Sequence, residues 1–193
     1  MDEQQLIQKC MRGDQGAFSD LVLQYERRVV TFAYRMLRDS HEAEDAAQEA
    51  FLRAWRKIDT FRPEASFLTW ILAITNHVCL DILRKKQRTG ENMHLSIHQT
   101  PDDEEAYAIQ IEDTSPGPEE VYRQKTAMQL IEEAIGELSE EHRMVILMRD
   151  INGLEYDEIA KATDTSLGTV KSRLSRARIA LRKILEKNRE LFI

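Results

Sequence analysis

Basic and hydroxyl-bearing side chains gather in a short stretch near the carboxyl end of the sequence. Lysine and arginine bind phosphates, and all of these side chains can hydrogen-bond to base edges in a DNA major groove. Positions three or four apart share one face of a helix. We therefore expect a helix with one DNA-binding face, formed by Thr169, Lys171, Ser172, Arg173, Arg176 and Arg178.

The residues before this stretch have the pattern of a helix-turn-helix. Ala160 is a small residue where two helices would cross closely, and Val170 would pack back on that crossing. Asp164 falls at the turn, where a left-handed backbone is often needed, and Ser166 can cap the second helix. An ordinary helical hairpin with a solvated basic face is the alternative. The combination of these features favours the helix-turn-helix.

A second polar face lies in the first half of the chain. Asp45, Gln48 and Glu49 are spaced three and four apart, so they share one side of a predicted helix. Phe51 and Trp55, also four apart, are expected to anchor that helix in a core. The spacing alone leaves open whether the polar face binds a partner or is simply solvated.

The spacing of apolar residues predicts helices throughout, and the seven glycines and four prolines are few. In the first part we expect a stop and a cap at Gly13-Asp14, a helix over 43–58 capped by Ser40, a loop over 59–66 and a helix over 67–88. In the second part, helices are expected from near 119 to 138 and over 140–150, 156–163 and 167–188. The fold class is all-α, with two small helical domains at 1–88 and 121–193.

Residues 89–120 are predicted to be an acidic, flexible linker between these domains. They contain nine carboxylates, no lysine or arginine, and three of the four prolines. The whole chain carries a net charge of −7, but the chain without this segment carries +2. The acidic total therefore does not exclude a nucleic-acid partner.

No pattern of residues indicates an enzyme, a cofactor or a metal. The sequence lacks a phosphate-binding glycine loop and a nucleophile elbow. Cys10 and Cys79 are far apart and are expected to be reduced thiols. His41 and Asp45 share a helical spacing but lack further ligands. There is no secretion signal and no run of about 18 apolar residues, so we expect a cytoplasmic protein without membrane insertion.

Three segments together resemble a known family. Residues 168–178, G-T-V-K-S-R-L-S-R-A-R, are similar to the recognition helix in the fourth region of bacterial sigma factors. Residues 43–55 resemble the core-binding helix of the second region, with its D-x-x-Q-E signature, and residues 67–71 resemble the start of the adjoining promoter-reading helix. Because first- and third-region domains are absent, the resemblance points to the extracytoplasmic-function (ECF) group.

The resemblance implies partners and roles. A sigma factor binds core RNA polymerase and directs promoter recognition and DNA opening, and many relatives are held by an anti-sigma factor that is often membrane-bound. The helix at 168–178 would read the minus-thirty-five element. The residues implied to dock on the clamp helices of the largest polymerase subunits are Asp45, Gln48, Glu49 and Phe51.

The resemblance also implies a site for the minus-ten element. Residues 59–67 resemble the loop that captures an extruded base, and Phe61 and Arg62 are of kinds that bind exposed single strands. Phe67 is favoured as a core residue. His77 stands where many relatives carry asparagine, which leaves the minus-ten preference open. The implied set is Phe61, Arg62, Trp70, Asn76, His77, Arg84 and Lys85.

Two other functions are compatible with parts of the sequence. A stand-alone helix-turn-helix regulator would explain residues 140–188 but not the first ninety. A helical adaptor could use the acidic segment to bind a basic partner, but it would leave the basic face at 169–178 without a purpose. Copurification with core RNA polymerase separates all three.

Overall fold

The computed structural model describes residues 2–62, 65–89 and 118–190, and every regular element in these ranges is helical. The predicted all-α class is confirmed, whereas most of the predicted linker lies outside the described residues. The amino-terminal part contains α1 (Glu3–Met11), α2 (Gln15–Leu37), α3 (Ser40–Arg56), the 3-10 turn η1 (Ile58–Thr60) and α4 (Phe67–Thr89). The carboxyl-terminal part contains α5 (Pro118–Glu137), α6 (Glu140–Ile146), the π-turn η3 (Leu147–Ile151), α7 (Tyr156–Ala162) and α8 (Leu167–Glu190).

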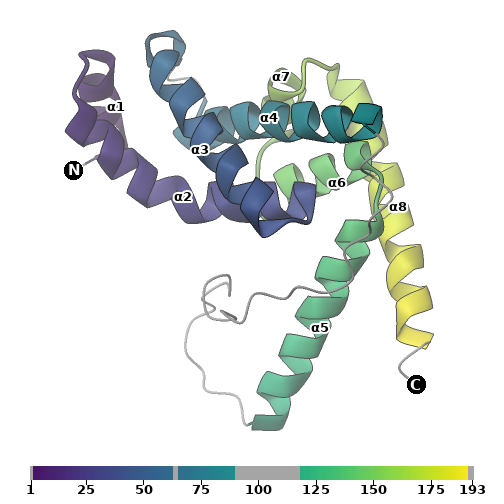
Figure 1. Cartoon of the computed structure of the whole chain (residues 1–193). Helices are drawn as coiled ribbons and strands as arrows, with labels where there is room; N and C mark the ends of the chain where they lie inside the picture. Colours follow the sequence, from purple (N-terminus) through teal and green to yellow (C-terminus); the bar gives the residue numbers. More distant parts are fainter. Residues whose placement is uncertain (1, 63–64, 90–117, 191–193) are drawn as a thin grey trace.

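The first domain is a bundle in which α2, α3 and α4 pack against one another and α1 packs against α2 (Figure 1). Gly13 has a positive φ of 87°, and Asp14 then caps α2 by accepting a hydrogen bond from the Ala17 amide at 3.0 Å. The stop and cap expected at these residues are thus confirmed. Phe32 and Ile71 are among the side chains fully buried between the helices.

The start of α3 differs from the prediction by one residue. Arg38 ends α2 in the left-handed region, with φ 62°, so the chain turns there. Asp39, not Ser40, is the cap, because its Oδ1 accepts a hydrogen bond from the Glu42 amide at 2.9 Å. Ser40 is the first helical residue. An aspartate and a serine cap equally well, so the sequence could not separate the two neighbours.

Helix α4 is long and apolar enough to cross a membrane by length and composition. Its apolar side chains, however, pack against α2 and α3, and Phe67, Ile71 and Cys79 are fully buried there. Long core helices commonly pass the same test of length and composition. We therefore describe α4 as the core helix of the first domain.

In the second domain, α8 packs against α5, α6 and α7. The helix predicted over 140–150 is divided, because the backbone widens into the π-turn after Ile146. The Leu147 carbonyl accepts hydrogen bonds from both the backbone amide and the side-chain Nδ2 of Asn152, at 3.0 and 2.9 Å. Gly153, with φ 76°, then redirects the chain toward α7.

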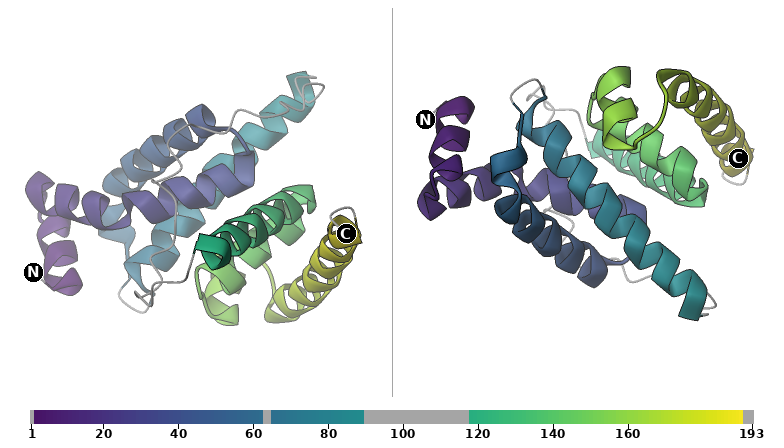
Figure 2. Two further views of the ribbon diagram at one scale, coloured as in Figure 1. Left: turned by 90° about the horizontal axis from the view of Figure 1, so that it is seen from below. Right: turned by 90° about the horizontal axis from the view of Figure 1, so that it is seen from above.

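The two domains lie against each other. Helix α4 contacts α7, and α2 contacts both α5 and α6, as Figures 1 and 2 show from three sides. The sequence predicted two domains on a tether and gave no indication of this packing. The contacts bring the predicted promoter-reading helix α4 next to the helix-turn-helix.

Candidate nucleic-acid and polymerase interfaces

The helix-turn-helix forms from α7 and α8 as the sequence predicted. Val170 is buried, Ala160 packs on the same core, and Asp164 adopts a left-handed φ of 50° at the turn. Ser166 accepts a hydrogen bond from the Thr169 amide at 3.1 Å and so caps α8. These local features fix the angle at which α8 leaves the turn.

Helix α8 separates its buried and exposed faces sharply. Val170, Leu174 and Ala177 are buried, whereas Lys171 and Ser172 on the other side are exposed. Arg176 is also exposed, and its guanidinium donates to the Ser172 side chain at 3.2 Å. A positively charged, solvent-facing helix surface of this kind can enter a major groove and reach phosphates and base edges. Thr169 is half-buried at the edge of this surface.

Two arginines of the predicted DNA-binding set are paired with carboxylates of the same domain. Arg173 contacts Glu141 at 3.2 Å, and Arg178 donates through Nε to Asp150 at 3.1 Å. Its hydrogen bond to the Asp150 carboxylate raises the pKa of the Arg178 guanidinium. The sequence missed these partners, because they lie 32 and 28 positions earlier and no local spacing indicates the contact.

The polar face predicted on α3 is present. Asp45 and Gln48 are exposed, and the Glu49 carboxylate accepts a hydrogen bond from Arg53 at 2.7 Å. Phe51 is different, because its side chain is only 7% exposed. It is a core anchor, as its spacing from Trp55 predicted, and its ring also borders a groove between α2 and α3. Its role in binding polymerase stays a prediction.

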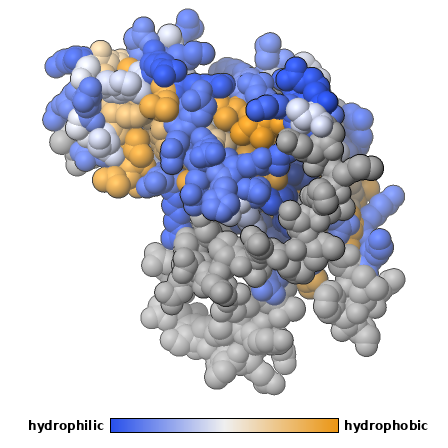
Figure 3. All heavy atoms as spheres, in the orientation of Figure 1, coloured by the Kyte–Doolittle hydropathy of each residue, from blue (hydrophilic) through white to orange (hydrophobic). Residues whose placement is uncertain are grey.

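A groove of about 740 Å³ lies beside this polar face, between α2 and α3. Phe18, Val22, Leu52 and Trp55 contribute apolar lining, and Gln48 reaches its edge. Phe18 and Trp55 pack with their rings tilted by 52° at a centroid distance of 5.0 Å and form part of the wall. In the surface view, apolar side chains are exposed where α1, α2 and α3 lie (Figure 3). The α2 side of this groove was not predicted from the sequence, although Phe18 and Val22 are four positions apart on one helix face.

Aromatic rings pack together where the segment before α4 meets that helix. Phe61 and Phe67 have ring centroids 6.1 Å apart, and Phe61 lies 5.3 Å from Trp70. Phe67 is fully buried, which confirms the core assignment. Phe61 is only 5% exposed, because its neighbours cover its ring. Its capture of an extruded base stays a prediction. Arg62 is exposed, and Trp70 is half-buried.

Further along α4, one of two adjacent residues is buried and the other is exposed. Asn76 is 1% exposed, and its Oδ1 has no hydrogen-bond partner within the described part of the chain. Its side chain is therefore not on the surface of α4 in this structure, and its role at the minus-ten element stays a prediction. His77 is exposed, with Nδ1 2.7 Å from the Ala73 carbonyl. Arg84 and Lys85, two turns later, are exposed on the same side.

The two cysteines are free and buried. Burial raises the pKa of the Cys79 thiol to about 12, and burial together with the nearby Asp14 raises that of Cys10. Among the described residues no group of three or more histidine, cysteine or carboxylate side chains could hold a metal ion.

These features define a class of protein: two helical domains, of which the second carries a helix-turn-helix with an exposed basic recognition helix. Comparison with known families agrees with this class. Residues 21–89 match the sigma-70 region 2 family, and residues 128–181 match the sigma-70 region 4 family.

Three curated relatives cover almost the whole chain. The ECF sigma factor SigW of Bacillus subtilis is 35% identical, with 93% of this chain and 94% of the relative aligned. The ECF sigma-E factor of Escherichia coli is 32% identical over 94% and 93%. The sigma-H factor of Pseudomonas aeruginosa is 31% identical over 95% and 94%. The chain belongs to the ECF sigma factors.

Solved structures share the fold. CnrH, solved in complex with the cytosolic domain of CnrY, gives a TM-score of 0.65 at 22% identity and covers 96% of this chain and 99% of its own. RpoE of Bartonella quintana, solved with the anti-sigma factor NepR, gives 0.64 at 24% identity, covering 88% and 96%. As a sigma factor, the protein binds core RNA polymerase and directs promoter recognition, DNA opening and transcription initiation.

Proposed function

We propose that polymerase docks on the exposed polar face of α3 and on the adjoining groove between α2 and α3. Asp45, Gln48 and Glu49 supply hydrogen-bonding groups along the rim. Leu23 and Leu52, which are 75% and 51% exposed, add apolar surface that a partner would cover. A docking surface with an apolar centre and a polar rim is typical of protein–protein interfaces.

We propose that the exposed side of α8 reads the minus-thirty-five element. The observation that carries this assignment is the separation of faces on α8, which buries Val170 and Leu174 and leaves Lys171, Ser172 and Arg176 in solvent. Arg173 and Arg178 lie beside these residues and are held by carboxylates. They are placed to contact phosphates once those carboxylates release them.

For the minus-ten element we propose the exposed side of α4 and the end of the preceding loop. Arg62, His77, Arg84 and Lys85 are all exposed there, and Trp70 is half-buried beside them. The cations can bind backbone phosphates of a separated strand, and the partly accessible indole can stack on a base. This set omits Phe61 and Asn76, because both are buried.

We further propose the division into a polymerase-binding and minus-ten domain at 1–88, a connecting segment at 89–120, and a minus-thirty-five domain at 121–193. The protein acts through binding, without catalysing a reaction of its own, and it works in the cytoplasm with RNA polymerase. Because RpoE of Bartonella quintana was solved with an anti-sigma factor, a protein of that kind is also the proposed negative regulator of this chain.

The polymerase surface is tested by replacing Gln48 and Glu49 together with alanine. Both lie on the surface of α3, where substitutions usually cost less than about 0.5 kcal/mol of stability. Holoenzyme formation with core polymerase should weaken while the thermal unfolding midpoint stays the same. A double variant that binds core normally, or one that unfolds, would contradict the assignment.

The alternative of a stand-alone regulator is tested with the free chain and promoter duplex. Each domain offers few phosphate contacts, and the net charge of −7 repels DNA at long range. Specific binding should therefore be weak until core polymerase is added. Nanomolar, sequence-specific binding by the free protein at physiological salt would favour the stand-alone regulator.

A further inference from the structure

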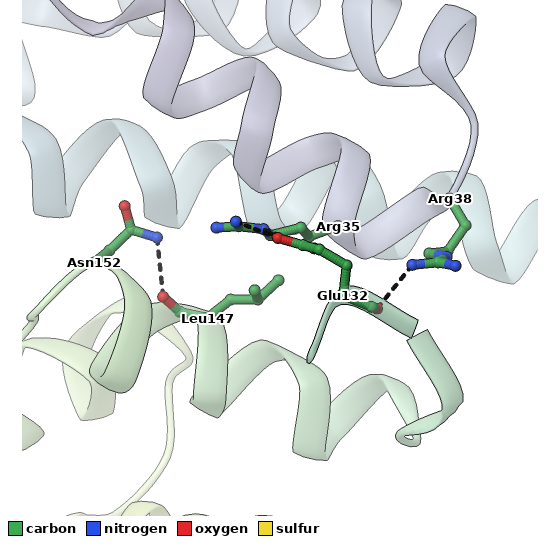
Figure 4. A network of polar contacts seen from close by, with 5 residues as sticks. All are labelled: Arg35, Arg38, Glu132, Leu147 and Asn152. Carbon is green, nitrogen blue, oxygen red and sulfur yellow. Dashed lines mark hydrogen bonds and ion pairs between the residues drawn. The ribbon is translucent and has the colours of Figure 1, made fainter. Parts of the chain in front are cut away.

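A polar junction connects the two domains through side chains that lie far apart in the sequence. Arg35, near the end of α2, is only 7% exposed. Its Nε donates to both carboxylate oxygens of Glu132 on α5, at 2.9 and 3.1 Å, and its Nη2 donates to the same carboxylate (Figure 4). The two residues are 97 positions apart, and the pair is a direct bridge between the domains.

Arg38 adds a second contact to the same turn of α5. Its Nη1 donates to the main-chain carbonyl of Glu132 at 2.9 Å, as Figure 4 also shows. Gly136, one turn further along α5, makes room for this side chain. A Cβ at position 136 would lie 2.7 Å from the Arg38 Cζ, which is too close for a real contact. The glycine therefore lets the Arg38 guanidinium lie flat against the helix.

Arg143, on α6, connects the carboxyl ends of α2 and α5. Its Nη1 donates to the Met36 carbonyl at 2.6 Å, and its Nη2 donates to the carbonyls of Gly136 and Leu138 at 2.6 and 3.0 Å. Helix ends leave carbonyls without partners inside the helix, and one guanidinium here serves two of these ends. Burial and the nearby Arg38 charge lower the pKa of Arg143. The hydrogen bonds to these carbonyls stabilise the charged form of its guanidinium.

Two further hydrogen bonds hold α4 near each of its ends. Thr69 Oγ1 donates to Glu158 on α7 at 2.8 Å, and Gln87 Nε2 donates to Glu140 on α6 at 2.9 Å. The helix assigned to the minus-ten element is thus connected to the second domain at two distant points. These contacts and the junction at α2 restrain the two domains as one unit.

This closed arrangement is too short to span a promoter. The two promoter elements are about 25 base pairs apart, which is roughly 85 Å at 3.4 Å per base pair. In the structure α4 contacts α7, and α7 packs on α8. Because packed helix axes are 8–10 Å apart, the axes of α4 and α8 are separated by roughly 20 Å. Duplex DNA of this length is too stiff to fold back over that distance.

We propose that the junction formed by Arg35, Arg38, Glu132 and Arg143 is a latch that keeps the free chain closed and unable to engage both promoter elements. This inference rests on the proposed assignment of the DNA-reading surfaces to α4 and α8. Binding to core polymerase opens the latch. The first domain docks on polymerase and the second domain is placed on DNA, and these two positions require the domains to separate. A latch that closes nine molecules in ten lowers the apparent affinity for polymerase about 10-fold.

The latch is tested by measuring the distance between the domains in the full chain. Dyes are attached to Arg56→Cys on α3 and Glu186→Cys on α8, both at exposed positions, while the two native thiols are buried. The wild-type background should give one short distance, and Glu132→Lys, which faces Arg35 and Arg38 with a like charge, should give a longer one. Glu133→Lys is the matched control, because Glu133 is exposed on the same helix.

A second variant opens the latch without changing any charge. Gly136→Ala should displace the Arg38 guanidinium and lengthen the distance for part of the population. Because alanine is a better helix former than glycine, α5 itself should not be weakened. Helical circular dichroism verifies that both latch variants remain folded. A wild-type distance that already equals that of Glu132→Lys, or latch variants that stay as closed as Glu133→Lys, would overturn the proposal.

Holoenzyme formation separates failure of the latch from failure of the proposed function. At limiting polymerase, Glu132→Lys should bind core up to about 10-fold more tightly than the wild type and Glu133→Lys. At saturating concentration all three should transcribe equally from the same promoter. Equal binding of all three overturns the latch. Absence of promoter-specific transcription from the wild type itself would instead count against the proposed function.

Discussion

Helices α4 and α8 have similar lengths, 23 and 24 residues, and both carry a proposed DNA-reading surface, but they are buried in different ways. Helix α8 packs along one stripe and exposes the rest of its surface. Helix α4 packs against α2 and α3 of its own domain and against α7 of the other, so its polar and aromatic residues are divided between the core and the surface. Residue type and spacing therefore select exposed residues on α8, whereas on α4 the same criteria also select core residues.

The largest expected effect is on stability, and it concerns Phe61. This residue tests whether a buried ring beside α4 serves the core. Replacing a buried phenylalanine with alanine costs about 3–5 kcal/mol. Phe61→Ala should therefore lower the free energy of unfolding by about that amount in urea titration, with Phe61→Leu much less harmful. A fully stable Phe61→Ala protein with a defect confined to strand opening would favour the base-capture role.

Arg176 tests the exposed side of the comparison. Arg176→Ala should cost about 1–3 kcal/mol of promoter binding if the side chain contacts a base, with no change in the unfolding transition. Transcription from a pre-melted bubble template should not rescue the variant, because the defect precedes DNA opening. The matched duplex template is the control, and rescue by the bubble would place Arg176 in a later step.

Asn76 and His77 separate the core from the surface at adjacent positions of α4. Because the Asn76 Oδ1 is buried without a partner, Asn76→Leu should be neutral or stabilise by about 1 kcal/mol in thermal unfolding. It should leave the minus-ten preference unchanged. His77→Asn should change that preference at unchanged stability, measured by transcription from a set of promoters altered at single positions. If Asn76→Leu changed the minus-ten preference and His77→Asn did not, α4 would have to rotate when it binds DNA.

The smallest effect is expected at Asp150, whose carboxylate holds Arg178. Asp150→Asn should release the guanidinium to phosphates and steepen the dependence of holoenzyme–DNA affinity on salt by up to about one unit of log–log slope. Arg178→Ala in the Asp150→Asn background should remove the increase. An unchanged slope would indicate that Arg178 is structural in both forms.

The sequence predicted the helical class, the helix-turn-helix and the polar face of α3, because local rules govern all three. The small Ala160, the left-handed Asp164 and the cap at Ser166 are features of a few adjacent residues. The burial of Phe61 and Asn76 was not predicted, because it depends on how α4 and the segment before it pack within the bundle. No periodicity of one segment determines that packing. Likewise, Glu132 and Arg35 form their pair through packing between domains.

The separation of Arg35 and Glu132 by 97 positions also sets the order of events during synthesis. Chains grow at about 5–20 residues per second, so Glu132 is added roughly 5 to 20 s after Arg35. Helices α1 to α4 are complete within that interval and can form their own core. Each newly made molecule therefore passes through a period in which its first domain is folded while no partner for Arg35 yet exists, so the proposed latch cannot close during that period.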